Sequence, residues 1–140
     1  MVKIKFIENK ELDELLCLWY EYHKIVNPKV TKLNLVKYLI QILDRRSSVA
    51  IGLYKEDKLI GFTLGYEISQ GLFYWEGIYV QPNYRLYTYK LINYSEAILK
   101  ENGYNFWITE ANTKFGRNLL NKIASKLTNK TYIKELKWEV

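Results

Sequence analysis

The sequence predicts an α+β fold in which a mixed, mostly antiparallel sheet is flanked by helices. Three observations lead to this class. Apolar residues recur at helical spacing in four segments, strand-like runs alternate with these segments, and three successive strands are joined by short polar turns. The predicted order is β-α-α-β-β-β-α-β-α-β. We expect residues 1–140 to form a single domain, because the chain has the length of one ordinary domain and shows no linker or internal repeat.

The first part of the chain predicts one strand followed by two helices. Residues 2–7 alternate apolar and charged side chains, as a half-buried strand does. Asn9 is placed to cap the first helix, which Asn27–Pro28 ends. The second helix begins near Thr31 or Asn34, because apolar residues then recur on one helical face.

The remainder of the chain predicts a meander and then a crossover. Strands joined by short polar turns pair antiparallel, whereas a helix between two neighbouring strands makes them parallel. We therefore expect the last strand of the meander to be parallel to the strand that follows the crossover helix. The predicted elements are strands at 48–54, 59–68 and 72–80, a helix from Arg85 to 102, a strand at 104–111, a helix after Asn112, and a strand at 131–138.

Composition limits the class of protein. Hydrophobic residues make up 49% of the chain and aromatic residues 16%, which is ample for a core. No apolar run approaches the length of a membrane span, and the N-terminus lacks a signal-peptide core, so we expect a cytoplasmic protein without membrane contact. Cys17 and His23 are single, which argues against a disulfide and against a metal site. Richness in Lys, Asn, Ile and Tyr is typical of an AT-rich bacterial or phage genome.

One junction in the sequence is distinctive. The strand at 72–80 runs into the turn Val80-Gln81-Pro82-Asn83-Tyr84-Arg85, and a helix follows. The first N–H groups of a helix lack intrahelical partners, so a basic residue there makes an anion site. This segment resembles the coenzyme-A-binding segment of the GNAT superfamily of acyl-CoA N-acyltransferases, in which a strand ending in Val is followed by x-Pro-x-Tyr-Arg. The net charge of +6 suits such an anionic ligand, and it also suits nucleic acid.

The resemblance implies a ligand and a set of residues that bind it. The ligand is acetyl-CoA, which serves as co-substrate for an unidentified amine. In the family, the backbone of the strand end binds the pantetheine arm and the loop after it binds the pyrophosphate. The residues implied are Ile78, Tyr79 and Val80 for the arm, Arg85, Leu86, Tyr87, Thr88, Tyr89 and Lys90 for the pyrophosphate, and Asn112, which contacts the coenzyme or simply caps a helix.

The sequence departs from the family pattern at two places. The family loop reads Arg-x-x-Gly-x-Gly/Ala, whereas Thr88 and Lys90 stand here at the positions of the small residues. Either these two side chains compensate with a hydroxyl and a charge, or the site no longer holds coenzyme A. The family also often carries a tyrosine that protonates the leaving thiolate, and that position is Leu119.

Glu76 is the candidate catalytic residue. It interrupts an apolar strand, and many members of the family carry a glutamate four residues before the Val that ends this strand. The resemblance implies that Glu76 removes a proton from the acceptor amine. Burial near Trp75 and Ile78 would raise its pKa toward the range of a useful base. The alternative is a carboxylate that faces solvent or pairs with a lysine on a neighbouring strand.

Three functions follow from these observations. The first is an acyl-CoA-dependent N-acetyltransferase. The second is a catalytically silent GNAT-like protein that binds a partner or has a structural role, for instance in a phage particle. The third is a binder of single-stranded nucleic acid that uses the 13 tyrosines for stacking, although no aromatic-basic motif supports it. The acceptor, the oligomeric state and any protein partner remain open.

Overall fold

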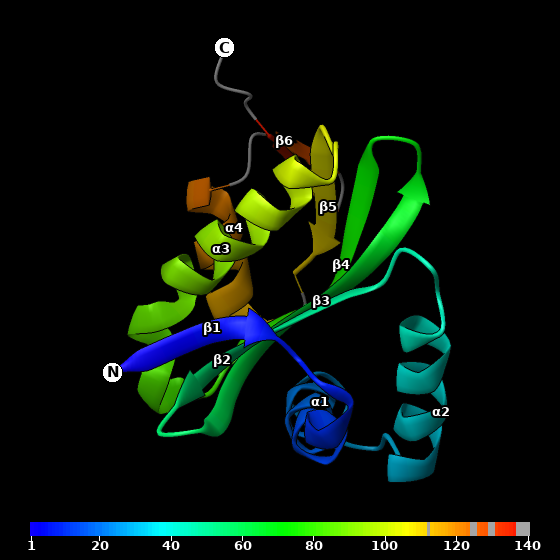
Figure 1. Cartoon of the computed structure of the whole chain (residues 1–140), viewed down its shortest axis with the longest axis vertical. Helices are drawn as coiled ribbons and strands as arrows, with labels where there is room; N and C mark the ends of the chain where they lie inside the picture. The colour runs from blue at the N-terminus through cyan, green and yellow to red at the C-terminus, as the bar shows by residue number, and fades with distance from the viewer. Residues whose placement is uncertain (112, 124–125, 129–130, 137–140) are drawn as a thin grey trace.

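A computed structural model describes residues 1–111, 113–123, 126–128 and 131–136 of the chain. In this part the strands form one sheet in the order β1-β2-β3-β4-β5-β7-β6 (Figure 1). Neighbouring strands are antiparallel except β4 and β5, which are parallel. The elements are β1 Val2–Phe6, α1 Leu12–Val26, α2 Lys32–Leu43, β2 Val49–Lys55, β3 Lys58–Ser69, β4 Leu72–Val80, α3 Thr88–Glu101, β5 Phe106–Glu110, α4 Lys114–Ile123, β6 Lys126–Thr128 and β7 Thr131–Glu135.

The predicted fold class and order of elements are confirmed. The structure adds one short strand, β6, between α4 and the final strand. Thr31 caps α2, since its hydroxyl oxygen accepts a hydrogen bond from the backbone N–H of Asn34 at 3.3 Å. The prediction that Asn9 caps α1 is wrong. Asn9 is the first residue of a 3₁₀ turn, Asn9–Glu11, and the carboxylate of Glu11 accepts from the N–H of Glu8 at 3.1 Å instead.

The sheet separates two layers of helices. Helices α1 and α2 lie on one side of it and α3 lies on the other (Figure 1). On the first side, Trp19 and Leu39 pack in one cluster with Phe62 of β3. On the second side, Leu91 of α3 packs with Trp107 of β5 and other apolar side chains of the sheet. Burial of both sheet faces explains why the central strands are almost continuously apolar.

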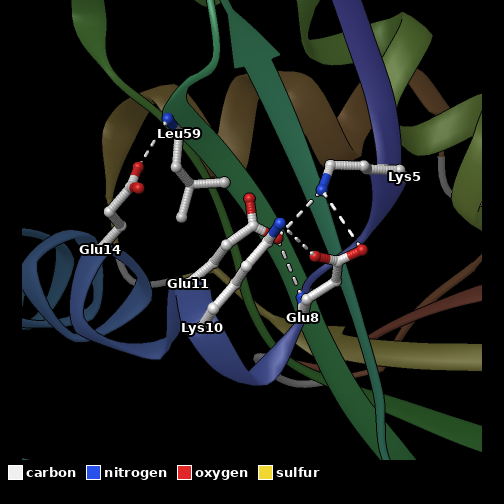
Figure 2. Close-up of polar contacts among 6 residues, drawn as sticks. All are labelled: Lys5, Glu8, Lys10, Glu11, Glu14 and Leu59. Carbon is white, nitrogen blue, oxygen red and sulfur yellow. Dashed lines mark hydrogen bonds and ion pairs between the residues drawn. The ribbon is translucent and has the colours of Figure 1, made fainter.

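Polar contacts fix the start of α1 against the sheet (Figure 2). The Lys5 ammonium of β1 lies 3.0 Å from the Glu11 carboxylate, and the Lys10 ammonium lies 3.2 Å from that of Glu8. Glu14 accepts a hydrogen bond of 3.1 Å from the backbone N–H of Leu59 in β3. These contacts tie the first helix to both β1 and β3.

Strand β4 is irregular at its middle and separates from β5 beyond it. Gly65 of β3 pairs with Trp75 and Leu64 pairs with Gly77, so Glu76 is an extra residue without a partner in β3. This arrangement is a β-bulge. Pairing between β4 and β5 covers residues 72–74 and 106–108 only. Beyond this point the two parallel strands part, and the gap between them positions the site.

Candidate functional site

A cavity of about 250 Å³ lies where β4 and β5 have separated. Its walls come from both strands, from the turn after β4, from the starts of α3 and α4, and from the end of α1. The lining residues are Tyr22, Ile25, Ile78, Tyr79, Val80, Arg85, Thr88, Thr109, Glu110, Ala111, Thr113, Phe115, Gly116, Leu119 and Leu120.

The structure brings part of the predicted binding set together at this cavity. Five of the residues expected to bind the cofactor line it, namely Ile78, Tyr79, Val80, Arg85 and Thr88. The other loop residues do not line it: Leu86 is 75% exposed, Tyr89 is 43% exposed, Lys90 is exposed, and Tyr87 packs against the core. Asn112 lies outside the residues that the structure describes.

Arg85 is held on the wall of the cavity. The centre of its guanidinium lies 4.2 Å from the centroid of the Phe115 ring of α4, a cation–π contact. Its Nε atom is buried and has no hydrogen-bond partner in the described part of the chain. Thr88 is also buried, and its hydroxyl donates to the carbonyl oxygen of Arg85 at 2.7 Å. The guanidinium therefore retains donor capacity beside the cavity, which suits an anionic ligand.

The turn that carries Arg85 differs from the prediction in one respect. Arg85 does not open the helix but lies within a 3₁₀ segment, Pro82–Tyr87, and α3 begins at Thr88. Pro82 explains the difference, because its fixed φ and missing N–H favour a tight turn at the start of a helical segment.

The end of β4 and the residue after it are hydrogen-bonded to α1. The Tyr79 hydroxyl donates to Glu21 Oε1 at 2.7 Å, and the Gln81 side-chain amide donates to Glu21 Oε2 at 3.3 Å. Burial and the neighbouring Glu21 carboxylate both raise the pKa of Tyr79, so its hydroxyl stays protonated at neutral pH. Sequence reasoning missed Glu21. No local signal could have found it, because the contact joins residues far apart in the chain.

Glu76 lies at the bulge, just before the cavity, and is not among the lining residues. Its side chain is half-buried, and burial raises the pKa of Glu76 to about 7, with the Glu110 carboxylate adding to the effect. The alternative role for Glu76, an ion pair with a lysine on a neighbouring strand, is not observed in the described residues. The ion pairs of Lys5 and Lys10 with Glu8 and Glu11 do not involve Glu76. A carboxyl group with this pKa can take up and release a proton at neutral pH.

Glu110 is the second site residue that sequence reasoning missed. It ends β5, is exposed, and lines the cavity. Beside it, the Thr109 hydroxyl donates to the carbonyl oxygen of Trp75 at 2.8 Å, across the gap in which the backbone ladder has stopped. The parallel register of β4 and β5, which ends at Tyr74 and Ile108, brings Glu110 near enough to Glu76 to affect the pKa of Glu76. The alternation of apolar residues alone does not show which residues of two neighbouring strands lie side by side.

Leu119 and Leu120 of α4 line the cavity with apolar groups. The position at which the family often carries a tyrosine is therefore not a proton donor here. Among the residues described, no three His, Cys, Asp or Glu side chains gather closely enough to hold a metal ion. No helix in those ranges has the length and apolar character needed to cross a membrane.

Beyond Tyr74, β4 has no pairing with its parallel neighbour β5, and it ends at a turn that carries Arg85, an arrangement consistent with the resemblance found in the sequence. The chain belongs to the acetyltransferase (GNAT) family, whose model matches residues 10–122. No curated protein matches it in sequence.

Solved structures with the same fold span almost the whole chain. An acetyltransferase of the GNAT family from Staphylococcus aureus Mu50 has a TM-score of 0.81 at 14% identity, covering 98% of this chain and 100% of the other. The PaiA N-acetyltransferase from Thermoplasma acidophilum, solved in complex with coenzyme A, has a TM-score of 0.73 at 16% identity, with 99% of each chain covered. The ribosomal-protein-S18-alanine N-acetyltransferase from Escherichia coli has a TM-score of 0.71 at 12% identity, covering 100% of this chain and 97% of the other. At such identities the similarity shows the fold.

Proposed function

We propose that this protein transfers the acetyl group of acetyl-CoA to the nitrogen of an amine. One observation carries the proposal beyond family membership. The gap between β4 and β5 opens into a cavity with the Arg85 guanidinium on its wall, and Glu76, whose pKa is raised to about 7, lies in β4 two residues before the lining residue Ile78. The region of this gap therefore holds a cation for an anionic substrate and a base for an amine.

The separated strand supplies a binding edge. Ile78, Tyr79 and Val80 pair with β3 through Thr63, Phe62 and Gly61. On the opposite edge of β4 the ladder with β5 has already ended at Tyr74. Backbone groups that point to this edge are placed to bind the amides of the pantetheine arm as an added strand would.

The loop after β4 supports binding despite its missing glycines. Only Arg85 and Thr88 of residues 85–90 reach the cavity wall. The Thr88 side chain is turned to the Arg85 carbonyl, and Tyr89 and Lys90 lie outside the cavity. The bulky residues at the family's small positions therefore leave the cavity open, and Arg85 supplies a positive charge for the phosphates.

The reaction assigns one chemical step to a side chain. Glu76 accepts a proton from the acceptor ammonium, which frees the nitrogen lone pair to attack the thioester carbonyl. A C–N bond forms and the C–S bond breaks; the nitrogen then releases its second proton to solvent, which leaves the neutral amide, and the departing thiolate of coenzyme A takes up a proton from solvent. A base with a pKa of about 7 suits this role near neutral pH, because it is both ionised and basic enough to remove the proton.

Titration calorimetry with acetyl-CoA tests this function. We expect the unaltered protein to bind with a dissociation constant in the micromolar range, and Arg85→Ala to weaken binding by about tenfold or more, since a charge-assisted contact to phosphate is lost. Arg46→Ala is the matched control, because Arg46 is exposed in the turn after α2. An absence of binding at near-millimolar acetyl-CoA would show that the proposed function is wrong.

A further inference from the structure

The end of β4 is paired on one side only, among the strands that the structure describes. Ile78, Tyr79 and Val80 pair with β3, whereas the pairing with β5 stops at Tyr74. The bulge at Glu76 also interrupts the ladder with β3 just before this stretch. An edge that lacks one neighbour and follows a bulge can shift its position unless other contacts fix it. A backbone edge that binds a ligand by hydrogen bonds must be held in place beforehand, because ordering it during binding lowers the affinity.

Glu21 of α1 holds this edge through two hydrogen bonds. Its Oε1 atom accepts from the Tyr79 hydroxyl at 2.7 Å, and its Oε2 atom accepts from the Gln81 side-chain amide at 3.3 Å. The two donors are two residues apart in extended backbone, so they leave the chain on the same side. Hydrogen bonds to a charged acceptor are the stronger ones. One carboxylate therefore fixes two neighbouring points at the end of β4.

The ring of Tyr79 is held at the same time as its hydroxyl. Its centroid lies 5.6 Å from that of Tyr22 in α1 and 6.2 Å from that of Phe62 in β3, and Tyr79 is 7% exposed. Tyr22 follows Glu21 directly, and both Tyr22 and Tyr79 line the cavity. The end of α1 therefore supplies one wall of the cavity and also the carboxylate that holds a second wall, the end of β4, at a fixed distance from it.

Glu14 provides a contrast on the same helix. It lies roughly two helical turns before Glu21, so both side chains leave α1 on the same side. The Glu14 carboxylate accepts a hydrogen bond of 3.1 Å from the backbone N–H of Leu59, the second residue of β3. Neither Glu14 nor Leu59 is among the residues that line the cavity. Both carboxylates attach α1 to the sheet, but of the two it is Glu21 that does so through a residue of the cavity wall.

We propose, building on the function proposed above, that Glu21 is a positioning residue for acetyl-CoA. It holds the unpaired edge of β4 where the backbone of this edge meets the amides of the pantetheine arm. Glu21 is not among the lining residues, and it acts through Tyr79 and Gln81 without touching the ligand.

Titration calorimetry and steady-state kinetics with acetyl-CoA test this role. Glu21→Ala removes both acceptor oxygens, so we expect the affinity to fall and KM to rise by about tenfold, the scale of one hydrogen bond to a charged group. The value of kcat at saturating acetyl-CoA should stay within about threefold. Loss of a negative charge by itself would strengthen the binding of an anion, so weaker binding points to lost positioning.

Two further variants and a control sharpen the test. Glu21→Gln should recover most of the affinity, because its carboxamide oxygen can still accept from the Tyr79 hydroxyl. Tyr79→Phe should cost less than Glu21→Ala, and adding it to Glu21→Ala should cause little further loss, since both remove the same contact. Glu14→Ala is the matched control, and its affinity for acetyl-CoA should stay within about twofold of that of the unaltered protein.

Amide hydrogen exchange measures the positioning without any ligand. In Glu21→Ala, exchange over residues 78–81 should be faster by about tenfold, because the strand end opens more often. In Glu14→Ala, exchange over the same residues should stay within about twofold of that in the unaltered protein. Circular dichroism confirms that each variant is folded.

The outcomes separate this inference from the proposed function. If the unaltered protein binds acetyl-CoA and Glu21→Ala binds it within about twofold as well, the inference is wrong and the transferase stands. Equal losses in Glu21→Ala and Glu14→Ala would also overturn the inference, since they would reflect a general loosening of α1. Unchanged exchange over residues 78–81 in Glu21→Ala would overturn it whatever the affinity. An unaltered protein that does not bind acetyl-CoA would reject the transferase and, with it, the role of Glu21.

Discussion

Two groups of glutamates in this protein have opposite electrostatic surroundings. At the start of α1, the Lys5 ammonium lies 3.0 Å from Glu11 and 4.0 Å from Glu8 (Figure 2). Burial alone would raise the pKa of Glu11, but hydrogen bonds from the Glu8 backbone and from Lys5 lower it overall. At the gap between β4 and β5, Glu76 is half-buried beside Glu110, and its pKa is raised to about 7.

The comparison separates a structural role from a chemical one. A carboxylate that accepts an N–H and pairs with an ammonium is stable as an anion, so it holds elements together and does not exchange its proton near pH 7. A carboxyl group that is desolvated and placed near another carboxylate is poised to exchange its proton at that pH. Glutamate side chains therefore hold a helix in position in one region and supply a base in the other.

The largest expected effect comes from Glu76→Gln. If Glu76 is the general base, kcat should fall by about 100-fold or more, because that is the usual contribution of proton transfer by a positioned side chain. The affinity for acetyl-CoA should stay within about twofold, since the substitution keeps the shape of the side chain. Steady-state kinetics and calorimetry measure the two quantities.

Glu11→Gln provides the contrast for that experiment. It makes the same chemical change at the neutralised carboxylate of the α1 region, and kcat should stay within about twofold. A loss of less than threefold in Glu76→Gln, or equal losses in the two variants, would remove Glu76 from the mechanism.

The pH dependence should show which group is titrating. We expect kcat/KM to decline as the pH falls below about 7, approaching tenfold per pH unit, because protonated Glu76 cannot act as a base. In Glu110→Gln a neighbouring negative charge is gone, so the pKa of Glu76 falls and the decline moves to lower pH. Burial is the larger cause of the shift, so the pKa should remain above 4.5. The measurement is the pH profile of kcat/KM for both proteins at constant ionic strength. If the decline at low pH occurs at the same pH in Glu110→Gln, the two carboxylates are not coupled.

The sequence was sufficient for the elements that depend on local signals. Strand β4 was predicted with both of its ends, because an apolar run lies between Gly71 and Gln81-Pro82. The parallel pairing of β4 with β5 followed from the intervening helix. Strand β6 was missed, since Lys126–Thr128 is too short to show a periodic pattern.

Much of the candidate site depends on contacts that no local pattern encodes. The bulge at Glu76 appears only when β4 is aligned with β3, since Trp75 and Gly77 both look regular in the sequence. Glu21 reaches Tyr79 from the far end of α1, and Glu110 reaches the gap only through the register of β5. The family motif led to Arg85 but not to the residues that surround it.

The smallest expected effect is on the free energy of unfolding, to which Glu76 and Glu11 contribute with opposite pH dependence. The pKa of Glu76 in the folded protein, about 7, exceeds its ordinary value of 4.5. Its favourable contribution is therefore complete below pH 4.5 and is lost as the pH rises through 7. The pKa of Glu11 is lowered, so its contribution is present above pH 4.5 and is lost as the pH falls through the lower value.

Urea unfolding at pH 8.5 should then show Glu76→Gln to be more stable than the unaltered protein and Glu11→Gln to be less stable. The shift at Glu76 corresponds to at most about 3 kcal/mol, and solvent screening of a half-buried group reduces the expected gain to about 1 kcal/mol. The difference at Glu76 should shrink as the pH is lowered below 7, and the difference at Glu11 should shrink only as the pH falls through its lowered pKa, because each carboxylate becomes neutral there. A destabilised Glu76→Gln at pH 8.5 would mean that Glu76 has a stabilising partner when ionised, and its assignment as a poised base would then be wrong.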